Sequence, residues 1–307
     1  MAASLNLDTF QVWWLILCMA YMMLNLQVLV LGQMGETNSY PTSFLTNYAS
    51  GSDGQHFRVL NNGQQAQLIL DEYSASGFGS KYKYLFGKIG IRMKLVPGDS
   101  AGTVTAYYMM SQTTRHDEMD FEFLGNVSGQ PYQLQTNIFA GGKGEREQRI
   151  FLWFDPTADF HEYSVLWNKR QIVFYVDDTP IRVFKNNKQS LGMDYPDSQP
   201  VGIYSTIWNG ENWATNDGWV KLNWTHAPFV ATYEKFNVDA CLVVNGNTAP
   251  CIQAAQNNWW EQSAYQTLGV HEVDQLNWVR KYYLVYNYCT DRGRNPTPPA
   301  ECALNVL

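Results

Sequence analysis

A succession of short apolar or alternating segments fills residues 66–233, and this pattern limits the fold more than any other feature of the sequence. We expect strands over residues 66–71, 87–96, 103–110, 118–124, 132–139, 149–154, 161–167, 171–176 and 180–184. Glycine, proline, asparagine and aspartate separate these segments. Short strands at near-regular spacing indicate an antiparallel sandwich, and a helical period competes only over residues 259–265 and 274–283. The sequence therefore predicts an all-β fold of two antiparallel sheets.

An uncharged apolar run covers residues 10–31. Such a run near the N-terminus predicts a secretory signal peptide over residues 1–32, with cleavage near Gly32. The preceding flank contains Asp8 and no lysine or arginine, and the run is long enough to span a bilayer, so an uncleaved membrane anchor is the alternative. Under both interpretations the rest of the chain is exported and works outside the cell.

Four cysteines outside the apolar run lie in the last quarter of the chain. An even number in an exported chain predicts two disulfides. Four cysteines allow three connectivities, and we expect the nearest-neighbour pairs Cys241–Cys251 and Cys289–Cys302. A zinc site is the alternative, although no C-x2-C pair is present.

The strand pattern ends near residues 229–233, and the cysteines, one expected helix and a proline-rich tail follow it. The remaining residues are too few to bury a large core of their own. We therefore expect a sandwich domain over residues 33–235 and a disulfide-bonded C-terminal extension over residues 236–307.

Aromatic residues make up 15% of the chain, with 11 tryptophans and 19 tyrosines, whereas charged residues make up only 16%. Aromatic faces stack on the apolar faces of sugar rings, so this excess favours a carbohydrate-binding cleft, with an aromatic-packed core as the alternative. The formal net charge is -7 and no block of lysine and arginine occurs. A nucleic-acid partner is therefore excluded, and a neutral polymer bound by a monomer is the natural expectation.

The segment His-Asp-Glu-Met-Asp-Phe-Glu-Phe at residues 116–123 alternates acidic and apolar side chains. Because side chains on a strand alternate between its faces, the carboxylates at 118, 120 and 122 share one face and the apolar residues between and after them share the other. Like charges at this spacing repel one another and raise at least one pKa. A solvent-facing acidic edge and a calcium site are the alternatives, but calcium loops are irregular and contain glycine.

Two carboxyl groups are what the cleavage of a glycosidic bond needs, since one attacks or stabilises the anomeric carbon while the other protonates the leaving oxygen. Asp120, between Glu118 and Glu122, helps to keep their titrations apart. The reaction needs no cofactor, and no metal site is expected. Strand rise places the two glutamate Cα atoms roughly 13 Å apart, so we predict that their side chains lean together to the retaining separation of about 5–5.5 Å.

The stretch HDEMDFEFLGN, followed by VSGQPYQLQTN, resembles the plant xyloglucan endotransglucosylase/hydrolases within glycoside hydrolase family 16. The resemblance extends from about residue 73 to residue 302. It includes SGFGSKYKYLFGKI at 76–89, LVPGDSAGTVTAYY at 95–108, GGKGEREQRIFLWFDPTADFHEYSVLWN at 141–168, IVFYVDDTPIRVFKN at 172–186, IWNGENWAT at 207–215 and YNYCTDRGR at 286–294.

The resemblance implies a β-jelly-roll sandwich with a concave substrate cleft, in which Glu118 is the nucleophile, Glu122 the acid/base and Asp120 the assisting carboxylate. It implies a cell-wall enzyme that cleaves the β-1,4-glucan backbone of xyloglucan and transfers the fragment to another xyloglucan chain. A β-glucan endohydrolase is the first alternative, and a non-catalytic wall-binding lectin is the second. Substrate contacts are implied for Tyr108, Gln135, Thr136, Asn137, Glu145, Arg146, Glu147, Arg149, Trp208, Asn212, Trp213, Gly218 and Arg294.

Several of these residues also have an ordinary structural interpretation. Without the resemblance, Trp208 and Trp213 suit a core equally well. Arg146 and Arg149 suit surface ion pairs better than a binding site. His116 is interpreted as structural rather than catalytic, because two carboxylates suffice for the reaction.

N-glycosylation motifs occur at Asn126, in Asn-Val-Ser, and at Asn223, in Asn-Trp-Thr. The resemblance implies a glycan at Asn126, directly after the acidic segment. Asn223 is a second candidate that the bulky tryptophan disfavours. The segment at residues 46–60 departs from the resembled enzymes, so the start of the domain is left open.

Overall fold

The computed structural model of this chain describes residues 42–253 and 257–305. The expected signal peptide or anchor over residues 1–32 lies outside the described residues, so both interpretations stay predictions. None of the helices within the described ranges is long and apolar enough to cross a membrane.

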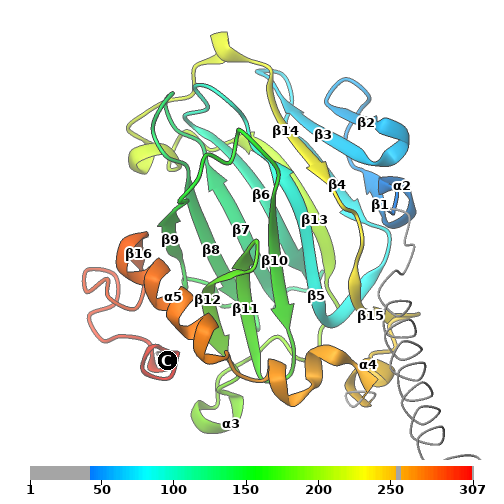
Figure 1. Cartoon of the computed structure of the whole chain (residues 1–307), viewed down its shortest axis with the longest axis vertical. Helices are drawn as coiled ribbons and strands as arrows, with labels where there is room; N and C mark the ends of the chain where they lie inside the picture. Colours follow the sequence, from blue (N-terminus) through cyan, green and yellow to red (C-terminus); the bar gives the residue numbers. More distant parts are fainter. Residues whose placement is uncertain (1–41, 254–256, 306–307) are drawn as a thin grey trace, which may run out of the picture. The chain divides into compact units, whose positions relative to one another are not determined.

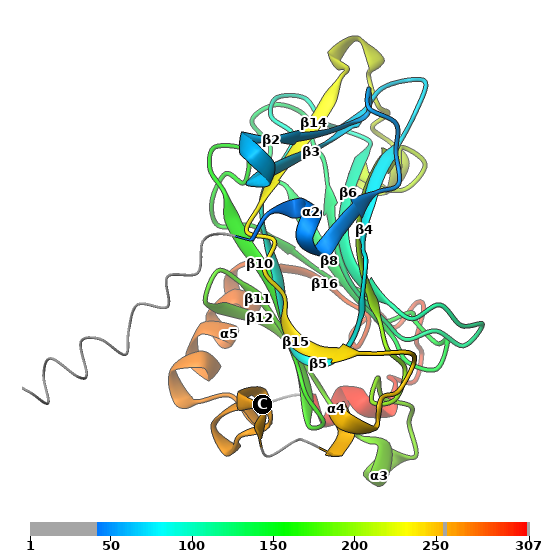
Figure 2. The same ribbon diagram turned by 90° about the vertical axis from the view of Figure 1, so that its right-hand side faces the viewer.

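Two antiparallel sheets pack face to face and form the body of the molecule (Figure 1, Figure 2). The first sheet has eight strands in the order β1 (Tyr48–Ser50), β4 (Ser76–Ser80), β13 (Gly202–Asn209), β6 (Thr103–Met110), β7 (Glu118–Leu124), β8 (Gln133–Phe139), β9 (Gln148–Phe151) and β16 (Leu284–Asn287). The second has the order β12 (Thr179–Lys185), β11 (Gln171–Val176), β10 (His161–Trp167), β5 (Lys83–Lys94), β14 (Phe229–Glu234), β3 (Gln65–Leu70) and β2 (Phe57–Leu60), with β15 (Asp239–Val243) paired to β5. The expected all-β sandwich is confirmed.

Helices are short and lie outside the sheets. The longest described helix, α5 (Val270–Tyr282), packs against the edge strand β12 (Figure 1) and matches the helix expected over residues 274–283. The second helical segment that the sequence suggested, residues 259–265, forms two single 3-10 turns instead. The remaining helical segments are α2 (Phe44–Asn47), α3 (Lys188–Leu191), α4 (Ala249–Gln253) and the 3-10 turns Asn61–Gly63, Thr215–Gly218, Trp224–His226 and Ala300–Ala303.

Four strands of the first sheet, β1, β4, β13 and β16, depart from the sequence expectation. The sequence pattern did not predict β4 because glycine occupies two of its five positions. It did not predict β13 because Ser205 and Thr206 interrupt the apolar run of that strand. β16 belongs to the C-terminal extension and pairs with β9, so the expectation that strands end near residues 229–233 is wrong. The extension supplies an edge strand to the first sheet because β9 would otherwise expose its unpaired backbone.

Both disulfides of the extension join cysteines that are close in the chain. They are Cys241–Cys251 and Cys289–Cys302, each with its Cα atoms 5.6 Å apart. The pairing in the structure is the nearest-neighbour pairing expected from the sequence. The second disulfide ties the segment after β16 to the 3-10 turn Ala300–Ala303.

One face of β7 belongs to the core. Met119, Phe121 and Phe123 are fully buried between the sheets. Phe121 packs edge-on against Phe174 of β11, with ring centroids 5.1 Å apart, and Phe123 packs against Tyr163 of β10 at 4.5 Å. Burial of these large side chains stabilises the sandwich and directs the alternate residues of β7 to the outer face of the first sheet.

Replacement of Phe121 by alanine is expected to lower the free energy of unfolding by about 3–5 kcal/mol, because it leaves a cavity between the sheets. Urea unfolding measures the change. Tyr73 is 85% exposed, and its replacement by alanine is an aromatic control that changes stability by less than about 0.5 kcal/mol. A loss below about 1 kcal/mol for Phe121→Ala would contradict this account of the core.

Candidate active site

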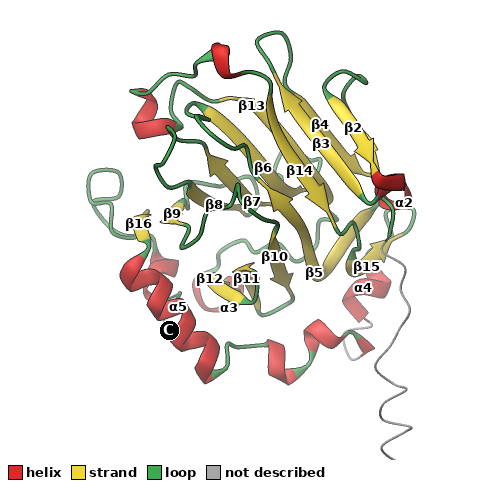
Figure 3. Ribbon diagram, turned by 45° about the horizontal axis from the view of Figure 1, so that its top comes forward, coloured by secondary structure: helices red, strands yellow, loops and turns green. Residues whose placement is uncertain are grey.

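A cleft of about 1710 Å³ crosses the first sheet. Every strand of that eight-stranded sheet contributes to its lining, and Figure 3 shows the strands from β13 to β9 side by side. Because β7 is the fifth strand in the order, the cleft continues on both sides of it. A groove of this extent can hold several sugar units of a polymer.

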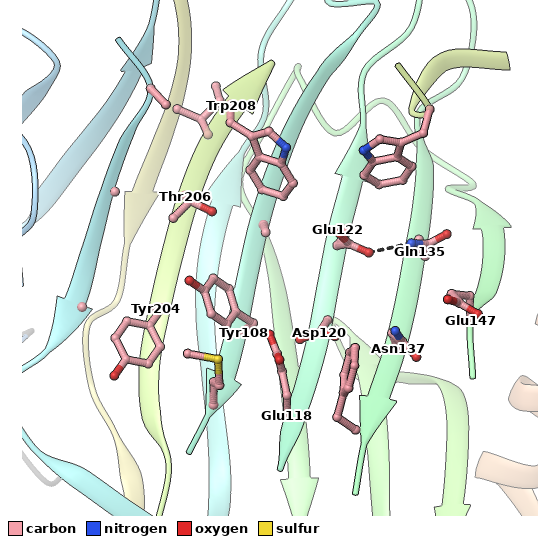
Figure 4. Close-up of a pocket in the computed structure, with 18 of the residues that line it drawn as sticks. Tyr108, Glu118, Asp120, Glu122, Gln135, Asn137, Glu147, Tyr204, Thr206 and Trp208 are labelled. Carbon is pink, nitrogen blue, oxygen red and sulfur yellow. Dashed lines mark hydrogen bonds between the residues drawn. The ribbon is translucent and has the colours of Figure 1, made fainter. Parts of the chain in front are cut away.

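Glu118, Asp120 and Glu122 project from β7 into this cleft (Figure 4), as the alternation predicts. β6 and β8 flank β7 on its two sides, so the alternative of a solvent-facing acidic edge is wrong. Asp120 is 6% exposed, and the side chain of Glu118 is 17% exposed. Carboxyl groups buried to this degree need protons or partners.

Asp120 is the most buried of the three carboxyl groups. Its burial, followed by the negative charges of Glu118 and Glu122, raises the pKa of Asp120 well above its usual range and outweighs the opposing charge of Arg182. Its Oδ1 is buried without a hydrogen-bond partner, and the carboxyl group shares a hydrogen bond with Glu118. These surroundings favour the protonated form of Asp120, which lies between the two glutamates and in that form donates to Glu118.

The two glutamates have different surroundings. Burial raises the pKa of Glu118, and the hydrogen bond from Asp120 and the nearby His116 oppose that rise. Burial also raises the pKa of Glu122, and the negative charge of Glu118 adds to the rise while a hydrogen bond from Gln135 opposes it. The partners of Glu118 thus favour its carboxylate form, whereas Glu122 lies in a setting that favours the acid.

Cross-strand contacts hold Glu122 in place. Gln135 on β8 donates from Nε2 to Glu122 Oε2 at 2.6 Å (Figure 4), and Arg149 on β9 donates from Nε to Gln135 Oε1 at 2.7 Å. These residues are register partners on adjacent strands, so the strand pairing itself brings them together. Arg149 also reaches Asp217 Oδ1 at 3.3 Å, and Asp217 lines the cleft although no pattern in the sequence pointed to it.

The C-terminal extension forms one end of the cleft. Arg294 donates to Glu147 Oε2 at 2.7 Å, and this contact raises the pKa of Arg294 above its usual range, so its guanidinium stays charged. Tyr286 of β16 donates its hydroxyl to Asp291 at 3.0 Å, and both residues line the cleft. Polar side chains of the sandwich and of the C-terminal extension therefore meet at this end of the cleft.

Most of the substrate contacts that the resemblance implies do line the cleft. Trp208 and Trp213 are among them; both are partly buried, and they line the groove while packing against the small hydrophobic cluster of Val104, Leu124 and Ala214. The full set of implied contacts found there is Tyr108, Gln135, Asn137, Glu147, Arg149, Trp208, Trp213 and Arg294.

The structure contradicts two of the implied substrate contacts, those of Arg146 and Thr136. Arg146 is 8% exposed and donates from Nε to Glu301 at 2.9 Å, so it joins the C-terminal extension to the sandwich instead of facing the cleft. Thr136 is buried on the inner face of β8, where its hydroxyl accepts a hydrogen bond from Arg182 at 2.9 Å. Strand alternation explains this, because the neighbours of Thr136, Gln135 and Asn137, face the cleft.

Three further implied contacts lie outside the cleft lining. Glu145 has a side chain that is 82% exposed and lies 3.9 Å from Arg294. Asn212 is exposed on the loop after β13. Gly218 has a φ of 82°, and a Cβ at this position would lie 2.2 Å from the carbonyl oxygen of Asn212, so the backbone requires glycine.

The sequence interpretation missed β4 and, apart from Trp208, the part of the cleft built by β13. Gly77 and Gly79 form its floor on β4, and a Cβ on Gly77 would lie 2.9 Å from the carbonyl oxygen of Ser205. Tyr204 and Thr206 of β13 line the cleft beside them (Figure 4). Glycine at alternate positions of a strand marks a close approach of backbone or ligand, and this signal was present in the sequence.

The fold and the cleft together define a β-sandwich enzyme of the glycosidase type. Residues 44–226 match the family described as glycosyl hydrolases family 16, and residues 254–302 match the xyloglucan endo-transglycosylase (XET) C-terminus. The chain belongs to glycosyl hydrolases family 16, among the xyloglucan endotransglucosylase/hydrolases.

Similar proteins cover nearly the whole chain. The chain is 52% identical over 281 residues to xyloglucan endotransglucosylase protein 34 of Populus tremula x Populus tremuloides, which covers 91% of this chain and 95% of the relative. It is 56% identical over 247 residues to the probable xyloglucan endotransglucosylase/hydrolase protein 5 of Arabidopsis thaliana, covering 80% and 83%.

Solved structures support the fold. A Bacillus licheniformis beta-glucanase superposes with a TM-score of 0.50 at 22% identity, covering 64% of this chain and 92% of that chain. A laminarinase from Flavobacterium sp. UMI-01 superposes with a TM-score of 0.51 at 16% identity, covering 65% and 95%. At these identities the likeness concerns the jelly-roll sandwich alone.

Asp120→Asn is expected to gain stability over the wild type as the pH rises. Burial raises the pKa of Asp120 in the folded state, so its contribution to stability is complete below the unfolded-state pKa of about 3.9 and is lost as the pH rises through the raised pKa. The amide of the variant does not titrate. Urea unfolding at about pH 4 and pH 7 measures the difference, and a difference that is the same at both values would contradict a protonated Asp120.

Proposed function

We propose that this protein cleaves the β-1,4-glucan backbone of xyloglucan and transfers the fragment to another xyloglucan chain. The observation that carries the proposal is the carboxyl trio Glu118, Asp120 and Glu122, which lies on a central strand inside a cleft that crosses the whole sheet. The names of the similar plant proteins, which give xyloglucan as the substrate, support the choice of polymer.

The surroundings of the two glutamates support the assignment of their roles. Glu118, which accepts from Asp120 and contacts His116, attacks the anomeric carbon as a carboxylate. Glu122, whose pKa is raised by burial, gives its proton to the leaving glycosidic oxygen as the carbon–oxygen bond breaks. The product of this step is a glycosyl ester on Glu118, and the route requires carboxyl groups about 5–5.5 Å apart, as predicted from the sequence.

The second step reverses the roles. Glu122, now a carboxylate, takes the proton of an incoming hydroxyl group, whose oxygen attacks the anomeric carbon and releases Glu118. An incoming sugar hydroxyl gives transfer and water gives hydrolysis. The cleft extends over strands on both sides of β7, so it offers binding area for a second glucan chain after the first product leaves. Binding energy of this kind favours the sugar over water.

A non-catalytic lectin on the same sandwich is the alternative from another class. A lectin has no use for one buried and two half-buried carboxyl groups side by side, since each carries a desolvation cost that a reaction would justify. A β-glucan endohydrolase would use the same residues and differs only in its acceptor. Product analysis therefore has to separate the three functions.

Incubation with xyloglucan and a labelled xyloglucan oligosaccharide is expected to give long labelled chains. Short unlabelled products alone would indicate hydrolysis, and no change in chain length would indicate a lectin. Glu118→Ala is expected to lower turnover by at least about 10³-fold while xyloglucan still binds, because only the nucleophile is removed. Glu145→Ala removes an exposed glutamate outside the cleft and serves as the control. Turnover by Glu118→Ala at the wild-type rate would show that the nucleophile is wrongly assigned.

We also propose that the protein is exported to the cell wall as a glycoprotein. The apolar run at residues 10–31, the two disulfides and the two glycosylation motifs support this location. Asn223 is exposed, and its side chain accepts from the hydroxyl of Thr225 at 2.9 Å, which leaves its amide nitrogen accessible. Asn126 is half-buried and donates to the carbonyl of Pro131 at 3.0 Å, and its amide nitrogen carries a second hydrogen that a glycan can replace.

Expression in a plant host is expected to place the protein in the medium of wall-less cells in a form that an N-glycosidase makes lighter. Asn126→Gln and Asn223→Gln are expected each to remove part of that shift, and the double variant all of it. Mass spectrometry of the secreted protein measures both effects. Retention of the protein with the membrane fraction would favour the anchor interpretation, and a mass that the glycosidase does not change would contradict glycosylation.

A further inference from the structure

His116 contacts the proposed nucleophile. It lies in the segment directly before β7, and its Nε2 is 3.0 Å from Oε2 of Glu118. Its side chain is 28% exposed, and its ring lies against Phe139 of β8 with centroids 4.9 Å apart. Phe139 is the register partner of Glu118, so the same strand pair places the ring and the carboxylate beside each other.

The backbone around His116 is fixed from both sides. The carbonyl oxygen of His116 accepts from the amide of Gly142 at 2.8 Å. The amide of Asp117 donates to the hydroxyl of Ser111 at 2.8 Å, and its Oδ1 accepts from the amide of Gly141 at 2.8 Å. These hydrogen bonds hold the backbone on both sides of His116, and the contact with Phe139 orients its ring.

The other groups around Glu118 supply no positive charge. Asp120 on β7 and Glu122 farther along the same strand are both acidic groups with raised pKa values, so neither can be a cation. Tyr108 on β6 has its pKa raised to about 12, first by burial and then by the charge of Glu118, so it stays a neutral phenol. Over the ranges that the structure describes, His116 is the one basic side chain within ion-pair distance of Glu118.

Charged groups near His116 have other partners. Arg115 pairs with Asp194 at 3.0 Å and donates to the carbonyl of Gly141. Asp117 has its pKa raised to about 6 by burial, and its carboxyl group faces the amide of Gly141 rather than the His116 ring. Its titration is common to the wild type and to every His116 variant, so it cancels when their pH profiles are compared.

We propose that His116 is a positioning residue whose protonated ring holds Glu118 ionised and oriented for attack. The inference rests on the proposed function and adds a residue that the two-carboxylate scheme treats as structural. A cation within hydrogen-bond distance stabilises a carboxylate against protonation, and burial strengthens this effect. In the acidic range, where a histidine ring carries a proton, His116 therefore keeps Glu118 active against the rise in pKa that burial imposes.

Two substitutions separate the charge of the ring from its other contacts. His116→Gln keeps a hydrogen-bond donor without the charge, and His116→Phe keeps the ring against Phe139 without the donor. The dependence of kcat/KM on pH, measured from about pH 4 to pH 8, reports the acid limb that Glu118 governs. Both variants are expected to shift that limb upward by about one pH unit, and His116→Phe is expected to lose about tenfold more in kcat.

His161 provides a matched control. Its Nδ1 lies 2.9 Å from Asp177 Oδ2, and its ring stacks on Phe154 with centroids 3.6 Å apart. It lies on β10 of the second sheet, outside the cleft lining. His161→Gln and His161→Phe remove an equivalent histidine–carboxylate pair and are expected to leave the pH profile unchanged.

The outcomes distinguish the inference from the proposed function. A wild-type protein without activity on xyloglucan contradicts the proposed function. An active wild type with His116 variants that lose the same factor at every pH, or lose nothing, contradicts the inference. If the His116 variants do not fold, nuclear magnetic resonance of the histidine ring in wild type and Glu118→Gln decides: the titration midpoint is expected to fall in the variant, and an unchanged midpoint overturns the inference.

Discussion

The two faces of β7 are the constraint on which the rest of this structure depends. Its inner face carries Met119, Phe121 and Phe123, which only a second sheet can cover. Its outer face carries carboxyl groups that would repel one another in a bare strand. The inner face thus forces the sandwich to form, and the sandwich in turn provides the rigid floor that keeps the carboxyl groups in register. Stability and chemistry share one strand because its side chains alternate.

A buried positive charge on the inner side of the first sheet offsets part of the negative charge of these carboxyl groups. Arg182 is 2% exposed and donates to the carbonyl oxygens of Thr136 and Arg146, behind the strand next to β7. Burial lowers the pKa of Arg182 to about 10, which still leaves it charged at neutral pH. Its charge acts on Asp120 from the interior, while Glu301 of the C-terminal extension neutralises the neighbouring Arg146. The interior accepts these ions because backbone oxygens and one carboxylate satisfy them.

Local patterns were enough to predict the sandwich, the carboxyl trio and the disulfide pairs. Each of them depends on residues that are close in the chain, such as the alternation from Glu118 to Phe123. The missed features depend on contacts between distant residues. Arg146 meets Glu301 across 155 positions, and β16 pairs with β9 although strands β10 to β15 and the helix α5 separate them in sequence. Gly77 and Gly79 weakened the strand signal of β4 for the same reason that they suit a cleft floor, namely the absence of side chains.

The order of strands in the first sheet also has a consequence for how the protein is made. β16 is the last strand in the chain, yet it lies at the edge of the sheet beside β9, and Arg294 follows it. The strands that carry the carboxyl trio and the floor of the groove precede β16 in the chain, so they are synthesised before it. The groove then has one open side until residues 284–302 emerge and the Cys289–Cys302 bond closes. Completion of the groove therefore depends on the last strand and on the Cys289–Cys302 bond, which separates assembly of the reactive strand from assembly of the full binding surface in time.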